Sequence, residues 1–196
     1  MIRIDSDVMM MEICNIVSLR SHCIKNKVGA VIVKDGRIIS TGYNGMLPGM
    51  HNCENLADCP RSDIKSGTQY EIGDCQHAET NAILFSARYG IAVQGASLYV
   101  NCSICRLCAR NIASAGITTV YYTSEKNYYN GIELLKEVGI NIIDLKDKMK
   151  NEPKSAFSIV VEDCEVYPRE GEVLFNIHTG EVNLKGYIIK PKEKHV

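Results

Sequence analysis

Two short motifs contain residues whose types and spacing suit metal chemistry. One is HAE at residues 77–79, and the other is CRLC at residues 105–108. One imidazole and two thiolates form a ligand set for zinc that leaves the fourth tetrahedral position to a water molecule. Zinc lowers the pKa of such a water from about 15.7 to about 7, which supplies hydroxide at neutral pH. Glu79 lies two residues from His77 and suits a carboxylate that moves protons beside the metal.

The order of the two motifs is more informative than either motif alone. A lone H-x-E is typical of a hydrogen-bonded histidine and a solvated carboxylate, and a lone C-x-x-C also fits a redox dithiol or half of a structural zinc site. H-x-E followed by P-C-x-x-C is the signature of zinc nucleobase deaminases. Ile104 stands at the proline position of that signature. Proline would stiffen the turn but binds no metal, so Ile104 affects the turn more than the ligand set.

Each motif begins a predicted helix, because apolar residues recur at helical spacing over residues 77–89 and 106–115. The N–H groups and the positive dipole end of a helix start favour a thiolate and a developing oxyanion. Other helices are predicted at 6–20, with Ser6 or Asp7 as N-cap, and at 132–138. Strands are predicted at 28–33 and 37–43, which form a hairpin around an Asp-Gly step, and at 97–100, 118–122 and 140–143. This order predicts a three-layer α-β-α arrangement, a sheet with helices on both faces.

Two regions do not follow this alternation. Residues 44–76 are rich in Gly, Asn, Asp, Cys and Pro, and a loop of this length needs something to order it. Residues 150–196 contain β-rich runs at 156–161, 172–178 and 184–190. We therefore expect a deaminase domain at 1–149 and a linker with a small antiparallel β appendage at 150–196.

The composition excludes several classes of partner. The chain has 196 residues and a net charge of -1, which gives no electrostatic footprint for a nucleic-acid polymer or an anionic membrane. The acidic N-terminal residues do not resemble a signal peptide, so we expect a cytoplasmic protein. Nine cysteines in a reducing compartment favour metal binding over disulfides.

Several segments resemble the deoxycytidylate deaminase family, particularly its phage members. These are KVGAVIV at 27–33, GYNG at 42–45, HAETNAI at 77–83 and GASLYV at 95–100, and the resemblance covers roughly residues 6 to 143. It implies the cytidine-deaminase fold, with a mixed five-stranded sheet between helices. It also implies hydrolytic deamination of dCMP to dUMP and ammonia by zinc-bound hydroxide, which supplies dUMP for thymidylate synthesis in the cytoplasm of a host cell.

The resemblance also assigns roles to residues. It implies that His77, Cys105 and Cys108 bind the catalytic zinc and that Glu79 is the proton shuttle. It implies that Asn44 and Ala78 bind the substrate, Asn44 through the sugar. The alternative for Asn44 is a turn residue with positive φ. At position 101 an asparagine stands where the family usually has threonine.

A second, structural zinc is implied by the same resemblance. Cys23, Cys53 and Cys75 match positions associated with it, and Cys59 or His51 is the fourth ligand. Such a metal would order the loop at 44–76. The alternative is a set of small buried thiols.

The family is frequently hexameric, activated by dCTP and inhibited by dTTP near the GYNG segment, and Mg²⁺ would accompany the allosteric nucleotide. Gly42 and Gly45 would let the backbone approach a nucleotide. Lys25 or Arg88 would meet phosphate or a neighbouring subunit, or be a solvated charge. Tyr128 and Tyr129 would contact base or phosphate, or pack their loop onto the domain.

Two other functions remain open at this point. One is deamination of dCTP or another cytosine nucleotide, and the other is a catalytically idle, zinc-stabilised nucleotide-binding subunit. Retention of Glu79 argues against the idle subunit, because a purely structural zinc does not need this carboxylate.

Overall fold

A computed structural model describes residues 4–53, 55–64, 69, 72–124 and 130–151, together with the backbone of four strands between residues 164 and 191. The chain divides into two compact units, Met1–Pro153 and Lys154–Val196. Among the described residues, no helix combines the length and the apolar character that crossing a bilayer requires.

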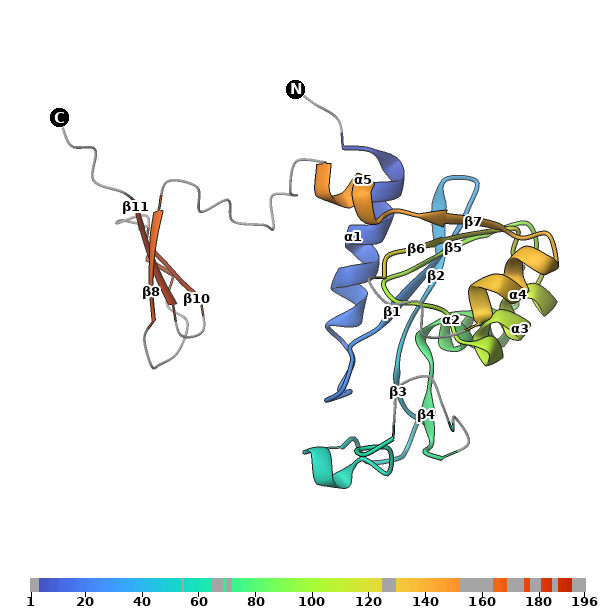
Figure 1. The fold of residues 1–196 in the computed structure, drawn as a ribbon, viewed down its shortest axis with the longest axis horizontal. Helices are drawn as coiled ribbons and strands as arrows, with labels where there is room; N and C mark the ends of the chain where they lie inside the picture. Colours follow the sequence, from blue (N-terminus) through green and yellow to red (C-terminus); the bar gives the residue numbers. More distant parts are fainter. Residues whose placement is uncertain are drawn as a thin grey trace. The chain divides into compact units, whose positions relative to one another are not determined.

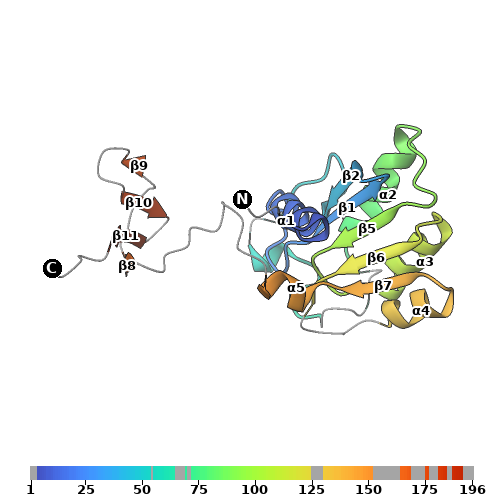
Figure 2. The same cartoon turned by 90° about the horizontal axis from the view of Figure 1, so that it is seen from above.

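The first unit is built on a mixed five-stranded sheet, as expected (Figures 1 and 2). The strand order is β2-β1-β5-β6-β7; β1 runs antiparallel to β2 and β5, and β5, β6 and β7 run parallel. A two-residue turn with positive φ at Asp35 and Gly36 joins β1 to β2, which confirms the predicted hairpin. The bounds are β1 Gly29–Lys34, β2 Arg37–Tyr43, β5 Ser97–Val100, β6 Thr119–Tyr122 and β7 Asn141–Asp144.

Helices cover both faces of this sheet, which confirms the α-β-α arrangement (Figure 1). On one face lie α1 (Ser6–Ser18) and α5 (Lys146–Asn151), and on the other lie α2 (Ala78–Arg88), α3 (Arg106–Ser114) and α4 (Gly131–Glu137). Successive residues of β1 point to opposite faces, because a strand alternates its side chains. Ala30 and Ile32 therefore join the core under α2 and α3, whereas Val31 and Val33 join the core under α1.

One expectation at the N-terminal edge of the first unit is wrong. The N-cap of α1 is Asp5, not Ser6 or Asp7: its Oδ1 accepts the N–H groups of Asp7 at 2.9 Å and Val8 at 3.3 Å. A carboxylate one position earlier reaches both free N–H groups. At the other edge, residues 146–151 form α5, which the sequence did not predict, and the carboxylate of Asp144 accepts the N–H of Lys146 at 2.9 Å.

The segment between β2 and α2 has little regular structure, as its composition predicts. It contains the short antiparallel pair β3 (Gly45–Met46) and β4 (Cys75–Gln76), together with the 3₁₀ turn η1 (Leu56–Asp58). Its cysteines therefore lie on loops and on a two-residue strand, not on a helix.

The second unit is an antiparallel four-stranded sheet with the order β8-β11-β10-β9. Its strands are β8 Cys164–Pro168, β9 Phe175–Asn176, β10 Glu181–Leu184 and β11 Tyr187–Pro191. Strand β8 was not anticipated from the sequence, and the expected run at 156–161 lies outside the described residues.

Candidate metal centre and active site

The starts of two helices position the three predicted zinc ligands. His77 is the N-cap residue of α2, Cys105 is the N-cap residue of α3, and Cys108 follows in the first turn of α3. Helices α2 and α3 pack against each other and against the same face of the sheet, so their N-terminal ends meet. Residues 28 positions apart in the chain thus share one site.

The three ligand atoms have the spacing that zinc requires. Nδ1 of His77 lies 3.5 Å from Sγ of Cys105 and 3.3 Å from Sγ of Cys108. Tetrahedral zinc with ordinary Zn–S and Zn–N bonds separates sulfur from nitrogen by roughly 3.5 Å. In the part of the chain that the structure describes, no other group of three such residues has ligand atoms this close together. The residues present therefore fit a zinc ion without rearrangement.

The electrostatics of the site favour a thiolate. Hydrogen bonding by Cys108, helped by His77, lowers the pKa of the Cys105 thiol to about 4. The N–H of Cys108 donates to the same sulfur at 3.4 Å. Cys105 in turn raises the pKa of the His77 imidazole. Because the thiolate is the form that binds metal, Cys105 is prepared as a ligand by its helix start.

Glu79 lies in the same site and is withdrawn from solvent. Glu79 is only 2% exposed. Burial raises the pKa of its carboxyl group, while the nearby His77 opposes the shift. A carboxyl whose pKa is moved upward toward neutrality exchanges protons more readily at physiological pH. The arrangement places three side chains with the spacing of a metal site beside a buried carboxyl group whose chemistry suits proton exchange.

A polar link between α2 and α3, which the sequence did not suggest, supports Cys108. The amide of Asn111 donates to Oγ1 of Thr80 at 3.0 Å, and this hydroxyl lies 3.6 Å from Sγ of Cys108. Thr80 follows His77 by three residues, and Asn111 follows Cys108 by three. The only sequence signal for this link is therefore helical spacing from the two motifs.

Two glycines let neighbouring elements approach the ligand-bearing segments. A Cβ on Gly42 would lie 2.3 Å from the carbonyl oxygen of Ala78, at the start of α2. The backbone of α2 fills this space, so the expectation that Gly42 admits a nucleotide is wrong. A Cβ on Gly131 would lie 2.3 Å from the carbonyl oxygen of Ile104. Helix α4 therefore packs on the turn before Cys105, and the fully buried Ile104 anchors that turn in place of proline.

Asn44 and Ala78 occupy different kinds of position. Oδ1 of Asn44 accepts the N–H of Val28 at 2.8 Å, and its Nδ2 donates to the carbonyl of Asn26 at 2.9 Å. Asn44 does not have positive φ, so the turn-residue alternative is wrong. Ala78 is fully buried against β2. Substrate contacts by either residue stay predictions.

Buried next to the ligands is one further polar group that the sequence did not indicate. Ser103 is 5% exposed, and its hydroxyl has no hydrogen-bond partner among the described residues. It lies two residues before Cys105, in the turn on which α4 packs.

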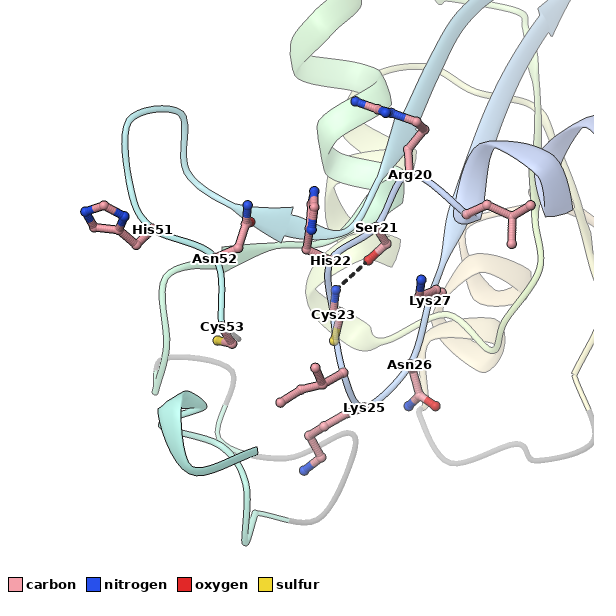
Figure 3. Close-up of a pocket in the computed structure, with 12 residues that line it drawn as sticks. Arg20, Ser21, His22, Cys23, Lys25, Asn26, Lys27, His51, Asn52 and Cys53 are labelled. Carbon is pink, nitrogen blue, oxygen red and sulfur yellow. Dashed lines mark hydrogen bonds between the residues drawn. The ribbon is translucent and has the colours of Figure 1, made fainter. Parts of the chain in front are cut away.

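The four other predicted zinc ligands lie near one another but do not form a closed set. Cys23, Cys53, Cys59 and Cys75 are all partly exposed. Burial, followed by the proximity of Cys59, raises the pKa of Cys53; burial, followed by the proximity of Cys23, raises the pKa of Cys75. The Cys75 thiol donates to Sδ of Met46 at 3.2 Å. The ring of His51 points away from Cys23 and Cys53 (Figure 3).

The structure also places the basic and aromatic residues that the sequence suggested for phosphate contacts. Nζ of Lys25 donates to the carbonyls of Arg61 at 2.6 Å, Ser62 at 3.2 Å and Ile64 at 2.9 Å, so it ties down the loop. The Arg88 guanidinium lies 5.9 Å from the centre of the Tyr89 ring on its own helix. Residues 128 and 129 lie outside the described residues.

Comparisons with known proteins give matches over most of the first unit. Residues 4–124 match the family described as the cytidine and deoxycytidylate deaminase zinc-binding region. Deoxycytidylate deaminase of Enterobacteria phage T2 is 35% identical over 187 residues, covering 79% of this chain and 96% of the relative. That of Mycobacterium phage D29 is 39% identical, covering 64% and 99%. A crystal structure of dCMP deaminase from cyanophage S-TIM5, in complex with dCMP and dUMP, has a TM-score of 0.60 and 28% identity, covering 74% of this chain and 99% of that one.

Proposed function

Because this chain belongs to the cytidine and deoxycytidylate deaminase family, we propose that it is a zinc-dependent hydrolase that converts dCMP to dUMP and ammonia. The observation that carries the proposal is the His77, Cys105 and Cys108 ligand set with the buried Glu79 beside it. The substrate is supported by the phage relatives, which are deoxycytidylate deaminases, and by the related cyanophage enzyme, which binds dCMP and dUMP.

Zinc held by these three residues would act as a Lewis acid that makes water nucleophilic at neutral pH. The residues of the chain perform the proton transfers. A carboxylate oxygen of Glu79 accepts a proton from the attacking water and delivers it to N3 of the cytosine ring. Glu79 then carries the remaining hydroxyl proton to the amino group on C4, which leaves as ammonia. Burial keeps Glu79 away from bulk solvent, so its protons pass to the base.

Replacing Glu79 with glutamine tests this role. Glu79→Gln keeps the size of the side chain but cannot accept the proton, so we expect kcat to fall by roughly 10²–10⁴-fold with the zinc content unchanged. The measurement is ammonia release from dCMP beside metal analysis. Glu137→Gln, at the exposed end of α4, is the matched control and should keep full activity. Undiminished turnover by Glu79→Gln would exclude Glu79 as the proton shuttle.

A second zinc bound by Cys23, Cys53, Cys59 and Cys75 is part of the same proposal. Its support is the mutual proximity of these thiols, which adds to burial in raising the pKa of Cys53 and Cys75. Thiolates that repel one another are stabilised by a shared cation. The loop between β2 and α2 has little apolar core of its own, and a metal would supply the missing order.

Regulation by dCTP and dTTP with Mg²⁺ and assembly into a hexamer complete the proposal, and both rest on the family resemblance. Residues 1–149 would be the deaminase domain and residues 150–196 an appendage to it. Velocity measured against dCMP concentration should become less sigmoidal with dCTP and more so with dTTP. Curves that neither nucleotide changes would remove the regulatory part and leave the reaction intact.

A further inference from the structure

The two sulfur atoms of the candidate metal centre lie beside different kinds of hydrogen-bond donor. Sγ of Cys105 accepts the N–H of Cys108 at 3.4 Å. This donor belongs to the backbone, so it is available to any C-x-x-C motif that begins a helix in this way. Sγ of Cys108 instead lies 3.6 Å from the hydroxyl of Thr80, a side-chain group on the neighbouring helix α2. The hydrogen bonding of Cys108 therefore depends on which residue the sequence places at position 80.

The Thr80 hydroxyl has a single hydrogen, and two polar groups lie within its reach. One is Sγ of Cys108 at 3.6 Å, and the other is the side-chain amide of Asn111, whose Nδ2 donates to Oγ1 of Thr80 at 3.0 Å. A cysteine that binds a metal does so as a thiolate, which has no proton and can only accept. Because the amide nitrogen of Asn111 donates to the hydroxyl oxygen, the hydroxyl hydrogen is left for the sulfur of Cys108.

This series of hydrogen bonds is shielded from solvent. Cys108 is fully buried, Thr80 is 8% exposed and Asn111 is half-buried. Bulk water therefore does not reach the sulfur of Cys108 and cannot replace the hydroxyl if this group is removed. In such an interior a hydrogen bond is stronger electrostatically than in water, and successive hydrogen bonds polarise one another.

The two helices fix the positions of both side chains. Thr80 lies in the first turn of α2, three residues after His77, and Asn111 lies about one turn after Cys108 on α3. Both helices pack on the same face of the sheet and contact each other. A β-branched residue such as threonine also has few rotamers in a helix, which limits the directions that its hydroxyl can take. The same packing that brings the ligands together thus places this pair of side chains.

We propose that Thr80 and Asn111 are positioning residues, which direct a hydrogen bond to the sulfur of Cys108 and thereby set how strongly this thiolate donates electrons to the zinc. A hydrogen bond to a thiolate withdraws electron density from the sulfur. The metal is then poorer in electrons and a stronger Lewis acid, which is the property that zinc-assisted hydrolysis requires. This role rests on the zinc-dependent reaction proposed above and extends it to two residues outside the ligand set.

The test is the absorption spectrum of the full-length protein after its zinc is replaced with cobalt(II), because the sulfur-to-cobalt charge-transfer band reports on the thiolates directly. Loss of a hydrogen bond raises the energy of the sulfur lone pairs, so Thr80→Val should shift this band to longer wavelength. Thr80→Ser keeps the hydroxyl and should keep the wild-type band. Asn111→Leu should shift the band in the same direction by a smaller amount, since the hydroxyl remains but is no longer directed.

Ser86→Ala is the matched control on the same helix. Ser86 is buried, and its hydroxyl donates to the carbonyl of Ala82 at 3.1 Å, so this variant loses a buried hydrogen bond without changing the one at Cys108. Cobalt bound by the other cysteines contributes equally to every variant and cancels in difference spectra. With zinc, ammonia release from dCMP should fall roughly 10-fold in Thr80→Val and stay unchanged in Ser86→Ala. Circular dichroism establishes that each variant is folded.

The spectra decide the outcome. A band of Thr80→Val at the position found in Ser86→Ala would overturn the proposal. Equal shifts in Thr80→Val and Thr80→Ser would also overturn it, because the packing at position 80 and not the hydroxyl would then be responsible. A wild-type spectrum identical to that of Cys108→Ser would reject the metal centre itself, and this proposal with it. The spectra are recorded without substrate, so they test the role of Thr80 even if dCMP proves not to be the substrate.

Discussion

The two groups of predicted zinc ligands in this chain lie on different kinds of elements. In the first region, Cys105 and Cys108 lie on the first turn of α3, and His77 lies at the start of α2. In the second, the four cysteines lie on loops and on the two-residue strand β4. The ligand atoms of the first group already lie at metal-binding distances from one another. The cysteines of the second group lie near one another but do not form a closed ligand set. Helices packed on a sheet organise ligands without metal, whereas ligands on loops depend on the ion for their geometry.

Ligand substitutions test this comparison with the largest expected effects. We expect Cys108→Ser to lose the catalytic zinc and at least ~10³-fold of the activity, since the open site has only three protein ligands. We expect Cys53→Ser to lose the second zinc and to loosen its loop while the sheet and helices remain. Metal analysis measures the zinc content, ammonia release measures the activity, and far-UV circular dichroism shows whether the sheet and helices remain.

Removing the metals with a chelator provides the control for both variants. The apo protein should keep the circular dichroism of the sheet and helices, because two apolar cores hold these elements and only Cys105 and Cys108 among their buried members are proposed metal ligands. Trypsin should then cut at Arg61 faster than in the zinc-loaded protein. A wild type with a single zinc per chain would reject the second centre, and the comparison would become one between a metal site and a set of thiols.

The close packing that organises the first region can be broken with one methyl group. Gly42→Ala would place Cβ against the backbone of α2, at 2.3 Å from the carbonyl of Ala78. We expect the free energy of unfolding to fall by about 3 kcal/mol, because helix and strand must separate. Gly45→Ala is the control, since the nearest atom, in the Tyr43 side chain, would lie 3.9 Å away. Urea denaturation measures both variants, and equal stabilities would contradict the packing argument.

The second region can be loosened without touching its cysteines. Lys25→Met removes the ammonium group that bonds three carbonyls of residues 61–64. We expect the free energy of opening this loop to fall by about 1 kcal/mol, with no effect on the rest of the unit. The Lys25 side chain is only half-buried, so its hydrogen bonds give only part of the stabilisation that a charged donor can provide. Hydrogen exchange of residues 61–64 should accelerate in Lys25→Met and stay unchanged in Lys27→Met. Equal exchange in the two variants would mean that Lys25 does not hold the loop.

The smallest effect concerns the Ser103 hydroxyl in the first region. Because this buried group has no partner among the residues that the structure describes, Ser103→Ala should leave the free energy of unfolding unchanged or raise it by up to about 1 kcal/mol. Ser40→Ala is the opposite case, since the buried Ser40 hydroxyl donates to the carbonyl of Ala82 at 2.7 Å. The free energy of unfolding of Ser40→Ala should therefore fall by about 1 kcal/mol. A comparable loss in Ser103→Ala would show that its hydroxyl is bonded in the folded protein.

The sequence by itself determined the five strands of the main sheet, the helices at the two motifs and the three residues of the candidate metal centre. Local properties suffice for these features: a β-branched run, an Asp-Gly turn and helical spacing are set by residues close together in the chain. Sequence patterns placed the N-cap of α1 too late and did not predict α5 or β8. The ends of helices and strands depend on side-chain contacts, which cannot be read from the periodicity of apolar residues.

Only the tertiary structure decided which groups meet. The Asn111–Thr80–Cys108 link between α2 and α3, the contact of Gly42 with α2 and the three bonds of Lys25 join residues 28 or more positions apart. The tertiary structure also decided the hydrogen bonds that Asn44 makes to residues 28 and 26, which lie 16 and 18 positions away, and the burial that raises the pKa of Glu79. A residue's type limits which bonds it can make, but its partner is chosen by the packing of elements that are remote in the chain.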